Sequence, residues 1–138
     1  MRVLLDTCVI CELQKPKPSA RVCERVAGIA IHDLFLSVIT LGELTKGVLL
    51  LEEGSKRKHL EKWLLRLESD FSDRILPIDA NVARMWGTLE ADARKRGRPI
   101  PTADGLIAAT ALRHGLHVMT RNVSDFKETR ALVINPWE

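Results

Sequence analysis

Short apolar runs alternate along the chain with longer segments whose apolar residues recur three or four positions apart. The short runs predict strands, because a strand buried on both faces is a compact block of apolar side chains. They cover residues 2–5, 34–38, 74–78, 117–120 and 132–134. The longer segments predict helices over residues 7–13, 20–31, 41–51, 56–71, 79–95 and 103–114.

Capping and breaking residues support several of these boundaries. Thr40, with Glu43 three positions later, matches a capping box, and Thr102 is expected to cap the last long helix. Pro16 and Pro18 end the first helix, because each lacks an amide donor and restricts the residue before it.

Strands separated by one or two helices favour a parallel sheet, since parallel neighbours need long crossover connections. The expected class is α/β, with three layers in which a sheet of about five strands lies between helices. A length of 138 residues fits a single domain over residues 1–138.

Composition narrows the class further. Hydrophobic residues make up 46% and charged residues 28%, so a folded globular chain is expected. No apolar run approaches the roughly 20 residues of a membrane-spanning helix, and no signal-peptide core is evident, so a cytoplasmic location without membrane contact is expected. The net charge of +3 permits a nucleic-acid partner without requiring one.

The cysteines Cys8, Cys11 and Cys23 are an odd number and do not form the disulfide framework of a secreted mini-protein. Cys8 and Cys11 form a C-x-x-C pair, but zinc ligands at usable spacing are missing and the pair lies in a predicted helix. Packing in a reducing compartment is the expected role.

Four acidic residues lie near the ends of the predicted strands. They are Asp6 after the first strand, Glu43 after the second, Asp104 at the start of a helix, and Asp125 after the fourth strand. Ligands of open parallel sheets bind beyond the carboxyl ends of the strands, so these acids are expected to converge on one pocket. Their mutual repulsion favours a hard divalent cation such as Mg²⁺ or Mn²⁺ as the counter-charge.

A cation held by carboxylates supports phosphodiester hydrolysis, because it lowers the pKa of a bound water and neutralises the leaving oxygen. The pattern therefore predicts nuclease chemistry with one or two ions. Capping is the alternative for Glu43 and Asp104, since acids in a first helical turn stabilise the helix dipole. Asp6 fits that alternative less well, because an acid directly after a buried strand needs a partner or a metal to stay charged.

Four segments, in order, resemble the PIN-domain family and, within it, the VapC-type toxins, especially their FitB-like branch. They are LLDTCVICEL (4–13), SVITLGELTKGV (37–48), PTADGLIAATALRHGL (101–116) and VMTRNVSDF (118–126), with INPW (134–137) after them. The resemblance runs the full length, and the order and spacing of the motifs make it specific. It implies an α/β/α PIN-like fold.

The resemblance also implies which acids bind metal and take part in catalysis. The family's first acid corresponds to Asp6, the glutamate of its helical segment to Glu43, and the aspartate of its A-D-x-x-I-A-A segment to Asp104. At the fourth position this chain has Asn122 in place of an acid, and Asp125 is the expected substitute. An amide oxygen at Asn122 can still bind metal or water, but it brings no charge and cannot act as a base.

Three hydroxyl groups are then expected to donate hydrogen bonds that orient the carboxylates. They belong to Thr7, Ser37 and Thr120. Helix capping is the alternative role for these side chains.

The implied function is a Mg²⁺- or Mn²⁺-dependent endoribonuclease, the toxin of a type II toxin–antitoxin pair, which hydrolyses RNA through a metal-activated water. The implied partners are an RNA substrate, a cognate antitoxin, a second copy of the chain, and operator DNA reached through the antitoxin. The alternative is a PIN fold with weakened metal binding at Asn122, which acts as a binding module and co-regulator with a DNA-binding antitoxin. The two hypotheses differ in whether Asp6 and Asp104 are needed for activity or only for stability.

Two surface features allow more than one interpretation. Basic clusters at residues 15–21, 56–58 and 94–98 fit either an RNA backbone or solvated helix ends. The chain has no Tyr and three Phe, so few side chains can stack on bases and recognition through the backbone is expected. The apolar stripe over residues 48–67 fits either an antitoxin groove or core packing.

Overall fold

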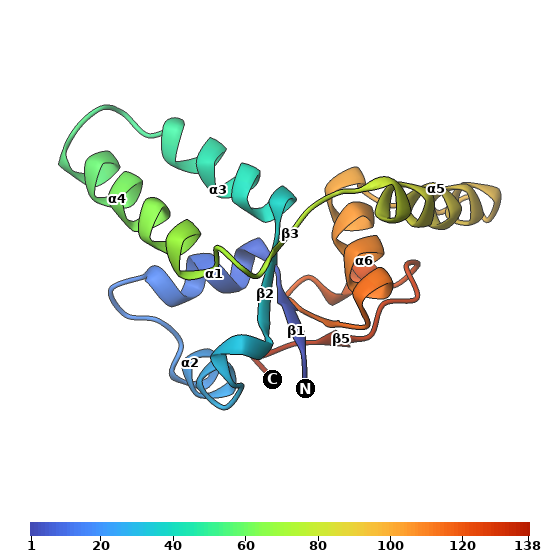
Figure 1. The fold of residues 1–138 in the computed structure, drawn as a ribbon, viewed down its shortest axis with the longest axis horizontal. Coiled ribbons are helices and arrows are strands. Elements are labelled where there is room, and N and C mark those ends of the chain that lie inside the picture. Colours follow the sequence, from blue (N-terminus) through green and yellow to red (C-terminus); the bar gives the residue numbers. More distant parts are fainter.

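The computed structural model describes residues 1–138 as a five-stranded parallel sheet with helices on both faces (Figure 1). The strands are β1 (Val3–Leu5), β2 (Leu34–Ser37), β3 (Ile75–Leu76), β4 (His117–Met119) and β5 (Val133–Ile134). They lie in the order β3-β2-β1-β4-β5, and every neighbouring pair is parallel. The central strand β1 places Val3 opposite both Leu34 and His117.

The helices form the two outer layers. They are α1 (Thr7–Gln14), α2 (Ala20–Ala27), α3 (Val38–Leu49), α4 (Ser55–Asp70), α5 (Ala80–Lys95) and α6 (Thr102–His114), with short 3₁₀ turns η1 (Ile31–Asp33) and η2 (Val123–Phe126). In Figure 1 the pair α5 and α6 lies to one side of the sheet, and α1 to α4 lie to the other. None of the helices has both the length and the apolar character needed to span a bilayer.

Alternation along the strands divides the core into two clusters. In β1, Leu4 packs with α5 and α6, whereas Val3 and Leu5 pack with α1, α2 and α3. In β4, Val118 and Met119 divide in the same way. Both faces of the sheet are therefore buried, as the apolar runs predicted, and the three-layer α/β prediction is confirmed.

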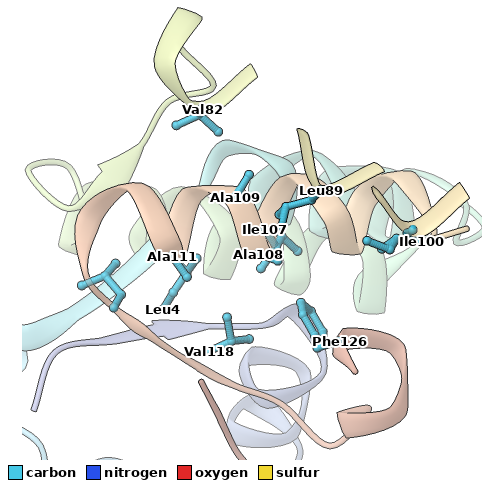
Figure 2. Packing of buried hydrophobic residues seen from close by; sticks show 12 residues of the cluster. Leu4, Val82, Leu89, Ile100, Ile107, Ala108, Ala109, Ala111, Val118 and Phe126 are labelled. Atoms are coloured by element: carbon cyan, nitrogen blue, oxygen red, sulfur yellow. The ribbon is translucent and has the colours of Figure 1, made fainter. Parts of the chain in front are cut away.

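Small residues let α6 lie close to the sheet and to α5 (Figure 2). Ala108, Ala109 and Ala111 are fully buried between Leu4 and Val118 below and α5 above. At Gly105, an added Cβ would lie 3.0 Å from the indole of Trp86 on α5. This close approach fixes the first turn of α6, which carries Asp104.

Two of the predicted helix starts are wrong. The helix that was expected after Thr40 begins at Val38, because β2 leads directly into it and the Ser37 hydroxyl caps it by accepting from the Ile39 amide at 3.0 Å. Thr40 is instead fully buried within α3. Thr102 is the first residue of α6, and the capping position belongs to Pro101, which has no side-chain hydrogen bond to offer.

Other boundaries differ by a few residues. The helix predicted over residues 20–31 ends at Ala27, where Gly28 caps it, and residues 31–33 form η1. The strand predicted over residues 74–78 is limited to Ile75–Leu76. It lies at the sheet edge and pairs only with β2, so few backbone hydrogen bonds define its length.

Candidate acidic site

The structure brings the four predicted acids to the carboxyl end of the sheet. Asp6 follows β1, Glu43 lies in α3, Asp104 is in the first turn of α6, and Asp125 lies in η2. Their charges act on one another: the pKa of Asp104 is raised to about 6, first by burial and then by Asp6, Asp125 and Glu43, in that order. Segments that are up to about 120 residues apart in sequence thus form one electrostatic site.

Asp6 is the most firmly held of these side chains. It is 5% exposed, its Oδ1 accepts from the Thr7 amide at 2.8 Å, and its Oδ2 accepts from the Thr120 hydroxyl at 2.7 Å. Its backbone N–H donates to the Met119 carbonyl at 3.0 Å, which ties the end of β1 to the end of β4. Burial raises the pKa of Asp6, and the hydrogen bonds from Thr120 and Thr7 oppose that rise. The hydrogen bonds therefore fix the direction of the Asp6 carboxylate, whereas burial disfavours its charged form.

Thr7 connects two of the acids. Its amide donates to Asp6, and its hydroxyl donates to Glu43 Oε1 at 2.7 Å. The first turn of α1 thus holds the carboxylate after β1 and the carboxylate of α3 at the same time. Of the three hydroxyl groups considered in the sequence, those of Thr7 and Thr120 donate to carboxylates, whereas that of Ser37 caps α3.

The segment after β4 contains both candidates for the fourth position. Asn122 and Asp125 are exposed, and η2 begins directly after Asn122. The backbone N–H of Asn122 donates to the Thr120 hydroxyl at 3.0 Å, so this segment is linked through Thr120 to Asp6. Asp125 contributes the charge that helps to raise the pKa of Asp104.

Cys8 also belongs to the site, and the sequence interpretation missed it. Its Sγ lies 3.5 Å from the Thr120 hydroxyl and 3.8 Å from Asp6 Oδ2, and it accepts from the Arg121 amide at 3.4 Å. Burial raises the pKa of the Cys8 thiol, so the sulfur remains a neutral S–H at neutral pH. Its position two residues after Asp6, in the first turn of a helix, was the available signal.

The donor set fits a hard divalent cation. The four acids supply only carboxylate oxygens, and none of them forms an ion pair with a lysine or arginine. No group of three or more His, Cys, Asp or Glu side chains is arranged to hold an ion by itself. Mg²⁺ does not need such a cage, because it usually keeps several waters and is bound through one or two carboxylates.

Fold and site together define an α/β/α protein with an acidic cluster at the carboxyl edge of its sheet, and comparisons with known proteins agree. The sequence model of the PIN domain matches residues 3–132. The toxin FitB of Neisseria gonorrhoeae is 41% identical over 98% of this chain and 98% of its own length. The VapC ribonuclease Y4jK of Sinorhizobium fredii is 39% identical over 99% of this chain and 98% of its own length.

Solved structures give the same result. The crystal structure of FitAcB from Neisseria gonorrhoeae has a TM-score of 0.93 and 40% identity, with 99% of each chain covered. The structure of FitAB bound to an IR36 DNA fragment has a TM-score of 0.93 and 38% identity, over 99% of this chain and 96% of that chain. The chain belongs to the PIN-domain family, and its relatives there are toxins of the FitB and VapC kind. The predicted resemblance is confirmed.

Proposed function

We propose that this protein is a divalent-metal-dependent endoribonuclease that acts as the toxin of a toxin–antitoxin pair. The observation that carries the proposal is the acidic cluster itself: Thr7 donates to both Asp6 and Glu43, and none of the four acids pairs with a lysine or arginine. The other three carboxylates also contribute to raising the pKa of Asp104 to about 6. Such a concentration of unpaired negative charge is unfavourable unless a cation binds there. Similarity over nearly the whole chain to a protein named VapC ribonuclease supports RNA as the substrate.

In this proposal Asp6, Glu43, Asp104 and Asp125 form the cluster that binds Mg²⁺ or Mn²⁺, with one or two of the carboxylates bound to the ion directly and the others through its waters. The bound ion would supply a water of lowered pKa and a counter-charge for the leaving oxygen of the phosphodiester. The chain's own hydroxyl groups orient the ligands: Thr120 fixes Asp6 Oδ2, and Thr7 fixes Glu43 Oε1. These hydrogen bonds fix the directions in which the Asp6 and Glu43 carboxylates can bind an ion.

An antitoxin is the proposed regulatory partner. The FitAB structure bound to DNA supports an assembly in which operator DNA is reached through the antitoxin, and a homodimer of this chain is part of the same proposal. Two cavities offer apolar surface to this proposed partner. One, of about 580 Å³, is lined mainly by apolar residues of α1, α2 and α4, and another, of about 240 Å³, extends from Thr7 and Glu43 to Leu60 on α4.

Cleavage of a labelled RNA pool tests the proposed activity. The purified protein is expected to cut RNA with Mg²⁺ or Mn²⁺ and to stop cutting in EDTA, and Asp6→Asn is expected to abolish cutting while it remains folded. Glu24→Gln, which changes an exposed acid on α2 whose side chain forms no hydrogen bond or ion pair, is the matched control and should cut like wild type. If wild type cuts nothing in either metal, the proposal fails and the binding-module alternative is favoured.

A further inference from the structure

The backbone of Arg121 lies at the rim of the acidic site, and its side chain extends from there toward Trp137. Arg121 directly follows Thr120, whose hydroxyl holds Asp6, and its own amide donates to Cys8 Sγ at 3.4 Å. Thr120, which precedes Arg121, and Cys8, which accepts from its amide, are thus both parts of the site. The position of this residue is set by the same contacts that set the position of Asp6.

The Arg121 side chain is held by an aromatic ring and leaves its donors free. The guanidinium carbon lies 5.0 Å from the ring centre of Trp137, and Arg121 donates no side-chain hydrogen bond to the protein. Trp137 is itself well anchored, because it packs against the core cluster around β1 and α1, and its amide donates to Asn135 Oδ1 at 3.0 Å. The guanidinium is therefore exposed but restricted in direction.

The other arginines of the chain show what distinguishes Arg121. Arg2 and Arg74 also lie over aromatic rings, but both donate side-chain hydrogen bonds to backbone carbonyls. Six of the twelve other arginines pair with carboxylates of the protein: Arg57, Arg74, Arg94, Arg96, Arg98 and Arg130. The charge of Arg121 helps to lower the pKa of Glu12. The two carboxylate oxygens of Glu12, however, already accept from Lys15 Nζ and the Ser19 amide, each at 2.9 Å. Arg121 thus remains available to an external anion.

We propose that Arg121, supported by Trp137, binds a phosphate group of the RNA strand beside the acidic site; the identity of that strand rests on the proposed function. A guanidinium is planar and offers donors in a fork that matches phosphate oxygens, and stacking on an aromatic ring restricts it in advance. An acidic cluster repels the polyanion that it has to cut. A fixed cation at its rim offsets that repulsion and positions the strand.

Binding of a fluorescein-labelled pool of 12-nucleotide single-stranded RNA, measured by anisotropy in EDTA at a series of salt concentrations, tests the proposal. Arg121→Ala is expected to weaken binding about tenfold at 0.1 M salt, as for loss of a charge-assisted contact. Loss of one phosphate contact should also reduce the slope of log K against log salt by about 0.7. Arg121→Lys should keep the slope but bind less tightly, because it keeps the charge and loses the fork.

Arg113→Ala is the matched control. Arg113 is exposed on the last turn of α6 and donates to no protein acceptor, so both affinity and salt slope should equal those of wild type. Equal effects of the two alanine variants would overturn the proposal, because they would reduce it to general charge. A weaker affinity for Arg121→Ala with an unchanged slope would overturn it too, because that result indicates base stacking.

Steady-state cleavage separates this inference from the proposed function. With Mg²⁺, Arg121→Ala is expected to raise KM about tenfold and to leave kcat within about threefold, because the guanidinium binds the strand without touching the acids. If wild type cuts RNA and Arg121→Ala has an unchanged KM, the subsite is refuted and the nuclease stands. If wild type never cuts while the binding defect of Arg121→Ala persists, the nuclease is refuted and the subsite stands.

Discussion

Carboxylates in two regions of the molecule have opposite surroundings. Where the end of α5 meets the segment after η2, each acid contacts an arginine: Glu90 with Arg94 at 2.7 Å, Asp92 with Arg130 at 2.9 Å, and Glu128 with Arg98 at 3.2 Å and with Arg96. Hydrogen bonds from these arginines lower the pKa of Glu90 and of Glu128. At the acidic site, burial and like charge raise the pKa of Asp6 and of Asp104.

The two regions differ in where the basic residues are placed. The chain does not lack basic residues, because it has 21 of them against 18 acidic ones. Basic side chains pair with acids along α5 and are missing from the cluster at the carboxyl edge of the sheet. The folded protein thus keeps an unfavourable charge arrangement in one place, which is typical of a functional site. The comparison predicts that neutralising an acid has opposite consequences in the two regions.

The largest expected effect is on cleavage. Asp104→Asn should lower RNA cleavage at least about 100-fold, since it removes a proposed metal ligand and effects of that size are seen even for the partners of ligands. Glu128→Gln, a like change in the ion-paired region, should cut within about threefold of wild type. Initial rates with Mg²⁺ measure both, and equal losses in the two variants would contradict the distinction between the regions.

A smaller loss is expected when only the support of a site carboxylate is removed. Thr120→Val deletes the hydroxyl that donates to Asp6 Oδ2, and cleavage should fall about 10- to 100-fold. Thr110→Val is the matched control, because Thr110 is equally buried but donates to the Leu106 carbonyl within α6. Activity of Thr120→Val at the level of this control would show that the hydroxyl of Thr120 does not position Asp6 for the reaction.

Without metal, Asp104→Asn should be more stable than wild type, although it should be less active. The pKa of Asp104 is raised from 3.8 to about 6 in the folded state, so the folded protein binds its proton first as pH falls. The penalty of the charged form is therefore fully present above about pH 6 and disappears below about pH 4. Asp104→Asn should increase the free energy of unfolding at pH 7.5 on the order of 1 kcal/mol, a value reduced for its partial exposure.

Urea denaturation in EDTA measures this change at two pH values. The gain of Asp104→Asn at pH 7.5 should vanish at pH 4, where wild-type Asp104 is largely protonated as well. A variant that is less stable than wild type at pH 7.5 would show that the Asp104 carboxylate is stabilised by its surroundings, contrary to the raised pKa.

The smallest expected effect is in the ion-paired region. Glu128→Gln should lower the melting temperature slightly at low salt, because the side chain loses its pairs with Arg96 and Arg98. The difference from wild type should shrink in about 1 M salt, where exposed charges are screened. A loss that is unchanged by salt would indicate that Glu128 stabilises the fold by packing.

The sequence predicts those features of the fold that depend on a single strand and the residues directly next to it. Alternation in the central strands requires two covered faces, and an acid after β1 must lie at the carboxyl edge, so the place of Asp6 followed directly. Thr40 was misassigned because a capping box can be matched by a residue inside a helix when an earlier serine already caps it. Such competition between caps is decided by where β2 ends.

Side-chain contacts between segments that are far apart in the chain could not be predicted from the sequence. The basic residues 94–98 had two interpretations, and the structure shows that Glu128, some 30 positions away, pairs with Arg96 and Arg98. Likewise, Cys8 enters the site only because β4 delivers Thr120 next to it. Such contacts depend on strand order, and no local pattern encodes that order.

Metal-dependent stability is the most direct measurement of whether the unpaired acids form a cation site. The free energy of unfolding at pH 7.5 would be followed as Mn²⁺ is raised from zero to the millimolar range, for wild type, Asp104→Asn and Glu128→Gln. Wild type and Glu128→Gln should gain about 1.4 kcal/mol once the ion reaches ten times its Kd, and Asp104→Asn should gain far less at the same concentrations. An unfolding free energy of wild type that does not change with Mn²⁺, or an equal gain in Asp104→Asn, would contradict a cation site at these carboxylates.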